Sequence, residues 1–174
     1  MSKSWLGRTA GKLPGAAMMA AVSAGLALSG ATPATAVNVS SPLASLAGRW
    51  VGEGRLGIKG NPTEQVKCRV NYVFAKADDQ LKQSIRCASA GGHVEVQSLV
   101  SHAAGKLTGT WQERVRNWSG KLSGTVTPRG FKVSVRGETL NANMDIIVID
   151  KKQIVEIQFI NSTLVGLTLV LQRG

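Results

Sequence analysis

The sequence predicts an all-β fold, an antiparallel up-and-down barrel of about eight to ten short strands. Apolar and polar residues alternate with period two in many short segments after residue 48, which is typical of half-buried strands. Turn-forming residues separate these segments at short intervals, and no segment after residue 36 has a convincing helical period. Consecutive hairpins favour an up-and-down barrel over a sandwich. An outer-membrane barrel would show aromatic girdles and polar-inward strands, and this chain shows neither clearly.

Residues 1–36 have the features of a signal peptide. Three basic residues precede an uncharged, mostly apolar stretch at 15–28, and Ala34-Thr35-Ala36 matches the A-x-A cleavage pattern. The apolar stretch is too short for a good membrane anchor, so we expect no membrane span after cleavage. The sequence therefore predicts a periplasmic or secreted protein.

The chain that remains after cleavage is long enough for one domain. Removing 36 of the 174 residues leaves 138, which we divide into an irregular arm at 37–47 and a barrel at 48–174. All ten acidic and 18 of the 21 basic residues fall in this part, so its formal charge is +8. That charge suits an anionic component of the cell envelope, although the basic residues could equally be scattered and solvated. Nucleic acid is not an expected partner of an exported protein with so few aromatic rings for base stacking.

Segments 66–74 and 81–87 form the clearest predicted hairpin. Both alternate, and the polar stretch at 76–79 between them has the length of a hairpin loop. Pairing centred on this loop places Cys68 opposite Cys87 and Tyr72 opposite Gln83. Directly opposed Cβ atoms lie near the separation that a disulfide needs, so we predict a Cys68–Cys87 bridge; two free thiols are the alternative. The bridge is worth about 3 kcal/mol in the chain-entropy description.

The other strands follow from the same pattern. Trp50, Leu56 and Ile58 share one face of a first strand, and turns are expected at 59–63 and 91–92. The later strands are predicted at 93–102, 107–111, 120–125, 131–135, 144–149, 154–160 and 164–171.

Gly48-x-Trp50 resembles the G-x-W motif that opens the first strand of lipocalin-like (calycin) barrels. The resemblance implies that Trp50 packs at the closed end beneath an arginine of the last strand, and Arg173 is placed to be that arginine. A wider resemblance is to an uncharacterised family of secreted alphaproteobacterial proteins, and it implies export but no particular activity. Its motifs are G-x-W-x-G-x-G at 48–54, C-R at 68–69, R-C-A-S at 86–89, G-x-W-x-E at 109–113 and L-x-R at 171–173.

Several aromatic and polar residues fall on the apolar faces of the predicted strands, which should point into the barrel. Because such mixtures line small-molecule sites, we predict that these residues bind a ligand in the lumen. These residues are Trp50, Tyr72, Gln83, Trp111 and Glu113. The alternative is a barrel filled by its own side chains, with Gln83 paired to Tyr72.

Basic residues on the outer face of the disulfide hairpin indicate a second candidate site, which would bind an anion. Arg69 would lie opposite Arg86, with Lys67 and Lys82 on the same face. Directly opposed like charges are destabilising unless an anion bridges them, and two solvated arginines are the simpler alternative.

Catalytic and metal-binding patterns are weak, so we expect no enzyme, metal or cofactor. His93 and His102 fall on opposite faces of one strand, and the disulfide would consume both thiols. No G-x-S-x-G motif occurs, and Glu113 and Glu156, which could form a carboxylate pair, fall on distant predicted strands.

The last three predicted strands have apolar residues on both faces. We expect the outer face to be covered by the arm at 37–47, a second subunit or another partner, with the arm or a homodimer favoured. Together these features predict a non-catalytic envelope binding protein, for a small apolar ligand or an anionic component. The alternative is a structural or protein-interaction barrel without a small-molecule ligand.

Overall fold

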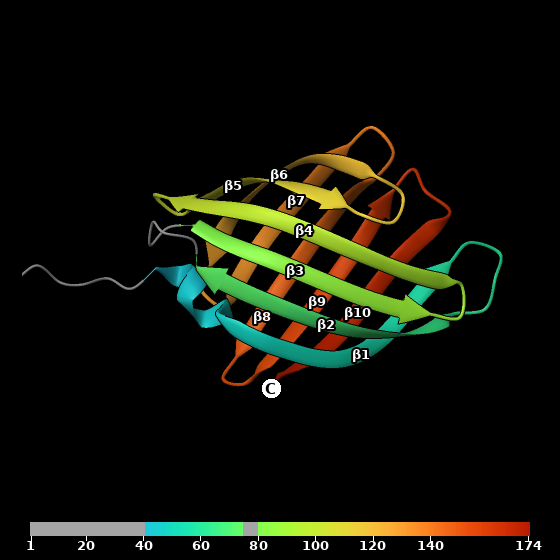
Figure 1. The fold of residues 1–174 in the computed structure, drawn as a ribbon, viewed down its shortest axis with the longest axis horizontal. Helices are drawn as coiled ribbons and strands as arrows, with labels where there is room; N and C mark the ends of the chain where they lie inside the picture. Colours follow the sequence, from blue (N-terminus) through green and yellow to red (C-terminus); the bar gives the residue numbers. More distant parts are fainter. Residues whose placement is uncertain (1–40, 75–79) are drawn as a thin grey trace, which may run out of the picture. The chain divides into compact units, whose positions relative to one another are not determined.

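The computed structural model describes residues 41–74 and 80–174 as a closed antiparallel barrel of ten strands (Figure 1). Each strand pairs with the next along the chain, and β1 closes the barrel against β10. The predicted all-β, up-and-down barrel is therefore confirmed. The strands are β1 Gly48–Ile58, β2 Glu64–Phe74, β3 Gln80–Ser89, β4 Gly92–Ala103, β5 Lys106–Glu113, β6 Trp118–Thr127, β7 Gly130–Gly137, β8 Asn141–Ile149, β9 Lys152–Ile160 and β10 Leu164–Arg173.

The predicted leader at 1–36 and residues 37–40 of the arm lie outside the described residues. The rest of the arm contains a 3-10 helix, Pro42–Leu46, where the sequence predicted only irregular chain. Leu43 and Leu46 of this helix are buried in the barrel's core, which fixes the segment in place. Among the described residues, no helix is long and apolar enough to cross a membrane.

The hairpin of β2 and β3 has the predicted register. Tyr72 pairs with Gln83, and Cys68 pairs with Cys87. The two cysteines form a disulfide with their Cα atoms 4.2 Å apart. The bridge lies on the inner side of the wall, where Cys68 is 3% exposed.

Glycines allow the strongly bent strands to lie close together. A Cβ atom built at Gly54 in β1 would lie 1.8 Å from the carbonyl oxygen of Thr168 in β10, so no other residue fits without moving the wall. Gly120 in β6 is similarly placed, 2.0 Å from the carbonyl oxygen of Arg136 in β7. Such glycines typically mark tight bends at the corners of barrels.

The end of the barrel where β1 begins, beside the 3-10 helix, is called the closed end (Figure 1). Side chains along each strand alternate between the inside and the outside of the wall. The largest fully buried side chains belong to this end: Leu43, Trp50, Leu81, Gln153 and Leu171.

The apolar outer surface of β8–β10 is smaller than the sequence predicted. One row, Ile147 paired with Ile154 and Ile154 with Val170, is apolar on the outside. The adjacent row contains Asp145 and Glu156, so the two faces are not uniformly apolar. The described part of the arm packs Leu43 and Leu46 into the core, so these side chains do not cover the outer row. A homodimer through that row remains a prediction.

Candidate functional site

The closed end of the barrel is built around Trp50 and Arg173. The Trp50 indole is fully buried and donates a hydrogen bond from Nε1 to the carbonyl oxygen of Leu46 at 2.7 Å. The guanidinium of Arg173 lies over this ring, 4.6 Å from its centroid, and donates to the carbonyl oxygens of Ser45 and Ala47. The stacking that the lipocalin-type resemblance implied is present. Trp50 therefore closes the barrel floor.

A polar network crosses the interior just above this floor. The Ser98 hydroxyl donates to Gln83 Oε1 at 2.5 Å, and Gln83 Nε2 donates to the Tyr72 hydroxyl at 3.3 Å. The amide of Gln153 also lies 3.3 Å from this hydroxyl, although β9 is three strands away from β2 around the wall. Burial raises the pKa of Tyr72 above its usual value, while hydrogen bonds from Gln153 and Gln83 act in the opposite direction. Tyr72 is therefore a neutral phenol at physiological pH.

The sequence predicted the contact between Tyr72 and Gln83 but missed Gln153. Gln153 is fully buried, and it precedes the apolar stretch that we read as the strand. Its side chain follows the inward parity of β9, two residues before the buried Val155. If the predicted strand had begun at Lys152, the alternation would have placed Gln153 on its inward face.

Trp111 lies flat against the inner wall of β6 and β7. A Cβ atom built at Gly120 would lie 2.8 Å from its Nε1, and one built at Gly137 would lie 2.8 Å from its Cζ2. The two glycines pair directly with each other, so the indole packs on backbone that carries no side chains. Its Nε1 is buried and has no hydrogen-bond partner among the described residues. Trp111 therefore faces inward and is buried, and its role in ligand binding stays a prediction.

Glu113 faces inward but serves the β5–β6 turn. Its carboxylate accepts hydrogen bonds from the backbone N–H groups of Val115 at 2.9 Å, Arg116 at 2.7 Å and Glu95 at 3.1 Å. Burial raises the pKa of Glu113, but these hydrogen bonds and the Arg116 charge outweigh it and leave the pKa below its ordinary value. Because its oxygens are already bonded to the backbone, Glu113 is placed to hold the turn rather than to meet a ligand.

Above the polar network several aliphatic side chains of the inner wall are half buried, beside the buried Val66, Trp111 and Ala142. We call this part the apolar cup, formed by Leu56, Ile85, Val96, Met144, Ile157 and Leu167. It is continuous on one side, because Met144 pairs with Ile157 and Ile157 with Leu167. All six side chains pack against the buried core while keeping part of their surface exposed. The cup is therefore the border between the packed interior and the open end of the barrel.

The predicted anion-binding residues share the outer face of β2 and β3 but do not form one cluster. Arg69 lies opposite Arg86, as expected, and both are exposed. Arg86 makes an ion pair with Glu95 of β4 at 3.1 Å, which the sequence analysis did not foresee. Lys67 lies opposite Ala88 and Lys82 opposite Val73, so neither directly extends the arginine pair.

The other residues considered for chemistry are apart from one another. His93 is exposed on the outside of β4, whereas His102 is half buried on the inner side and accepts a hydrogen bond from the Gly105 N–H at 3.2 Å. Glu156 is exposed on the outside of β9, so it does not pair with the inward-facing Glu113. No group of three or more metal-ligating side chains occurs in residues 41–74 and 80–174.

Comparisons with known proteins identify the fold but no family. No protein-family model and no curated protein sequence matches the chain. The chain is similar to the crystal structure of Rv2717c from M. tuberculosis, with a TM-score of 0.65 and 14% sequence identity. The match covers 76% of this chain and 94% of that one. At this low identity, the likeness establishes a shared barrel fold and nothing further.

Proposed function

We propose that the protein is an exported, non-catalytic binding protein of the cell envelope whose barrel holds a small apolar ligand. The apolar cup carries the proposal, because inward-facing aliphatic side chains that solvent reaches are typical of an unfilled binding site. The closed floor at Trp50 leaves entry to the opposite end of the barrel. Of the described charged residues, Glu64, Glu113 and Arg173 have the inward parity of their strands, and each is bonded to backbone groups. The cup therefore favours an uncharged ligand.

Two buried groups support a non-catalytic role. Acid–base catalysis at neutral pH needs a group whose pKa lies near neutrality. The pKa of Tyr72 is raised by burial and that of Glu113 is lowered by hydrogen bonds, so both are displaced away from neutrality. The inward-facing polar side chains instead bond to one another and to the backbone.

The disulfide supports export. Disulfides persist in the periplasm and outside the cell but are rare in the reducing cytosol. The Cys68–Cys87 bridge thus agrees with the predicted leader and with the resemblance to secreted alphaproteobacterial proteins, both of which remain proposals.

Titration with a neutral fluorescent probe, N-phenyl-1-naphthylamine, tests the cup. We expect saturable binding to the oxidised chain without its leader. Met144→Gln should weaken it about fivefold, because the polar amide replaces apolar contact surface. Ile147→Gln is the matched control, since Ile147 lies on the outer face of the same strand.

Two results would contradict the cup. One is the absence of saturable binding, which would favour the structural or protein-interaction barrel. The other is equal weakening by the Met144 and Ile147 variants, which would place the probe elsewhere on the protein.

Binding of an anionic envelope component is the second candidate function. Its specific support is Arg69, which faces Arg86 across the hairpin and has no ion-pair partner among the described residues. Such binding should weaken as salt rises, because exposed charges are screened. Binding in the uncharged cup should not depend on salt.

A further inference from the structure

The outer wall of β2–β7 carries two adjacent rows of mostly polar side chains, which we call the polar belt. The first row is uncharged and follows the strand pairing through Ser84, Gln97, Gln112 and Ser119. The second row runs beside it and includes two exposed apolar side chains; its members in order are Val73, Lys82, Leu99, Thr110, Lys121 and Arg136. The belt thus crosses strands rather than following one of them.

Two hollows lie along the belt. One, of about 530 Å³, extends over β2–β5; it is lined by outward-facing residues that include Lys82, Gln97 and Leu99, and also by Gln83, Ser98 and Trp111 of the same strands. The other, of about 720 Å³, is lined by Ser119, Lys121 and Arg136 among others at β6 and β7. The hollows adjoin, because Gln112 pairs with Ser119 and donates a hydrogen bond to Asn117 Oδ1 at 3.2 Å. The surface is therefore hollowed across six neighbouring strands.

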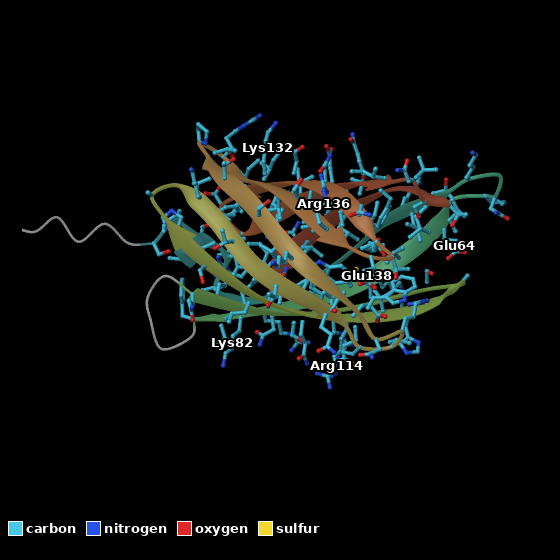
Figure 2. The ribbon with its side chains drawn as sticks, turned by 90° about the horizontal axis from the view of Figure 1, so that it is seen from above. Glu64, Lys82, Arg114, Lys132, Arg136 and Glu138 are labelled. Atoms are coloured by element: carbon cyan, nitrogen blue, oxygen red, sulfur yellow. A yellow bond between two sulfur atoms is a disulfide. The ribbon has the colours of Figure 1, made fainter. Side chains whose placement is uncertain are left out.

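The described residues of β2–β7 and their turns carry a strongly positive charge. The described residues between 64 and 138 include eleven basic and four acidic ones, and one of the four is the buried Glu113. Glu138 is the single carboxylate among the described residues that line either hollow. Figure 2 shows Lys82 and Arg114 on one side of the barrel and Lys132 of β7 on the opposite side, so the basic residues of β2–β7 extend around the wall.

Lys121 and Arg136 form the most evident anion site in the belt. They lie directly opposite each other on β6 and β7, an arrangement that is destabilising without a counter-charge. The Arg136 guanidinium is held by the carbonyl oxygens of Val135 at 2.8 Å and Ala142 at 2.9 Å, and by Asn143 Oδ1 at 3.1 Å. An anion that bound between Lys121 and Arg136 would therefore contact a guanidinium whose position is already fixed.

The uncharged row supplies hydrogen-bonding groups next to these cations. Gln97 Oε1 accepts a hydrogen bond from Arg114 at 3.3 Å, which orients the amide and leaves its N–H donors without a partner among the described residues. Ser84 and Ser119 add hydroxyl groups that can both donate and accept. Such a row matches the hydroxyl groups of a sugar.

We propose that the polar belt binds an extended anionic polysaccharide. Neighbouring strands lie about 4.8 Å apart, close to the length of one sugar unit, so a chain lying across the strands meets one side chain of each row per unit. Acidic groups on the sugars would reach Lys82 and the Lys121–Arg136 pair. The proposal rests on the envelope location given above, but not on a ligand in the apolar cup.

Two other classes of partner fit the belt less well. Nucleic acid binding to single strands uses exposed aromatic faces, whereas Trp118 is the aromatic residue of the second hollow and Arg116 lies over its ring at 5.5 Å. A membrane surface would need apolar anchors on a convex face. The belt is hollowed, and its exposed large apolar residues are Val73 and Leu99.

Binding of polygalacturonate to the oxidised chain without its leader tests the proposal, with dextran as the neutral polymer and oligothymidylate as the nucleic acid. Lys121→Gln with Arg136→Gln should weaken polygalacturonate binding about tenfold at low salt, because two charge-assisted hydrogen bonds are lost. Lys59→Gln with Lys151→Gln removes the same charge from exposed turns outside β2–β7 and should change binding less than about twofold. Lys121→Gln alone, which leaves the Arg136 contacts intact, should show about half of the double variant's loss in free energy.

Three results would overturn the proposal. Polygalacturonate could fail to bind, the control pair could weaken binding as much as the belt pair, or oligothymidylate could bind as tightly with the same sensitivity to the belt variants. Titration of N-phenyl-1-naphthylamine into the same samples distinguishes failure of the belt proposal from failure of the proposed ligand site in the apolar cup. Probe binding should persist in the Lys121–Arg136 variant if only the belt proposal fails.

Discussion

The buried polar side chains of the barrel bond to one another and to the backbone, through Tyr72, Gln83 and Gln153 on one side and Glu113 on the other. From the sequence, Tyr72 and Gln83 could be placed together, because both lie in one hairpin whose register a disulfide fixes. Gln153 could not be linked to Tyr72, because the two residues are 81 positions apart and meet across the barrel. The role of Glu113 was also hidden, since three backbone N–H groups determine it rather than a side-chain pattern.

Glu113 should make stability depend on pH. Its pKa is lower in the folded chain than its ordinary value of 4.5, so its contribution is complete above that value and is lost as the pH falls through the folded pKa. At neutral pH, Glu113→Gln should lower the free energy of unfolding by about 2 kcal/mol, because an amide cannot accept all three backbone hydrogen bonds. Denaturant unfolding between about pH 7 and about pH 3 should show the difference from the parent shrinking as the pH falls. Glu138→Gln, at an exposed site, is the control, and a difference that grew toward acid would refute this role.

Gly54 should be essential to the closure between β1 and β10. Gly54→Ala would place a methyl group 1.8 Å from a backbone oxygen of β10, whereas Gly57→Ala in the same strand meets its nearest atom at 3.5 Å. We expect Gly54→Ala to lower the free energy of unfolding by about 3 kcal/mol and Gly57→Ala by less than about 1 kcal/mol. Thermal unfolding of the two variants measures this directly. Equal melting temperatures would mean that the close approach of β1 and β10 does not limit stability.

At the scale of elements, the β2–β3 hairpin was predictable and the outer wall was not. Alternation and the two cysteines determine the register of the hairpin, and the structure has that register. The ion pair of Arg86 with Glu95 depends on the next strand, whose register the sequence reading left open. The polar belt likewise becomes visible only when the pairing of six strands is known.

The disulfide should contribute measurably to the stability of the barrel. Cys87→Ser opens a covalent loop in which 18 residues lie between the two cysteines, so the unfolded chain gains entropy. We expect the free energy of unfolding to fall by about 3 kcal/mol relative to the oxidised parent. Denaturant unfolding with and without reductant provides the comparison, because reductant should affect the parent but not the variant. If the oxidised parent and the variant unfolded identically, the disulfide would not contribute to stability.

At the scale of the whole molecule, the two ends of the barrel have different roles. The 3-10 helix, Trp50 and Arg173 close one end, and the polar network lies directly above them. The apolar cup occupies the wall beyond this network, where several aliphatic side chains are half buried. The fold class followed from alternation alone, but this division of the interior did not, because it depends on how ten strands tilt around the barrel axis.

Native mass spectrometry of the protein purified from the periplasm of its own host tests the central claim most directly. We expect a chain two hydrogens lighter than its reduced mass, carrying a small adduct that leaves on collisional activation. The same adduct should be reduced in Met144→Gln and retained in Ile147→Gln. A bare chain in all three samples, together with no binding of the naphthyl probe, would contradict a ligand-holding lumen.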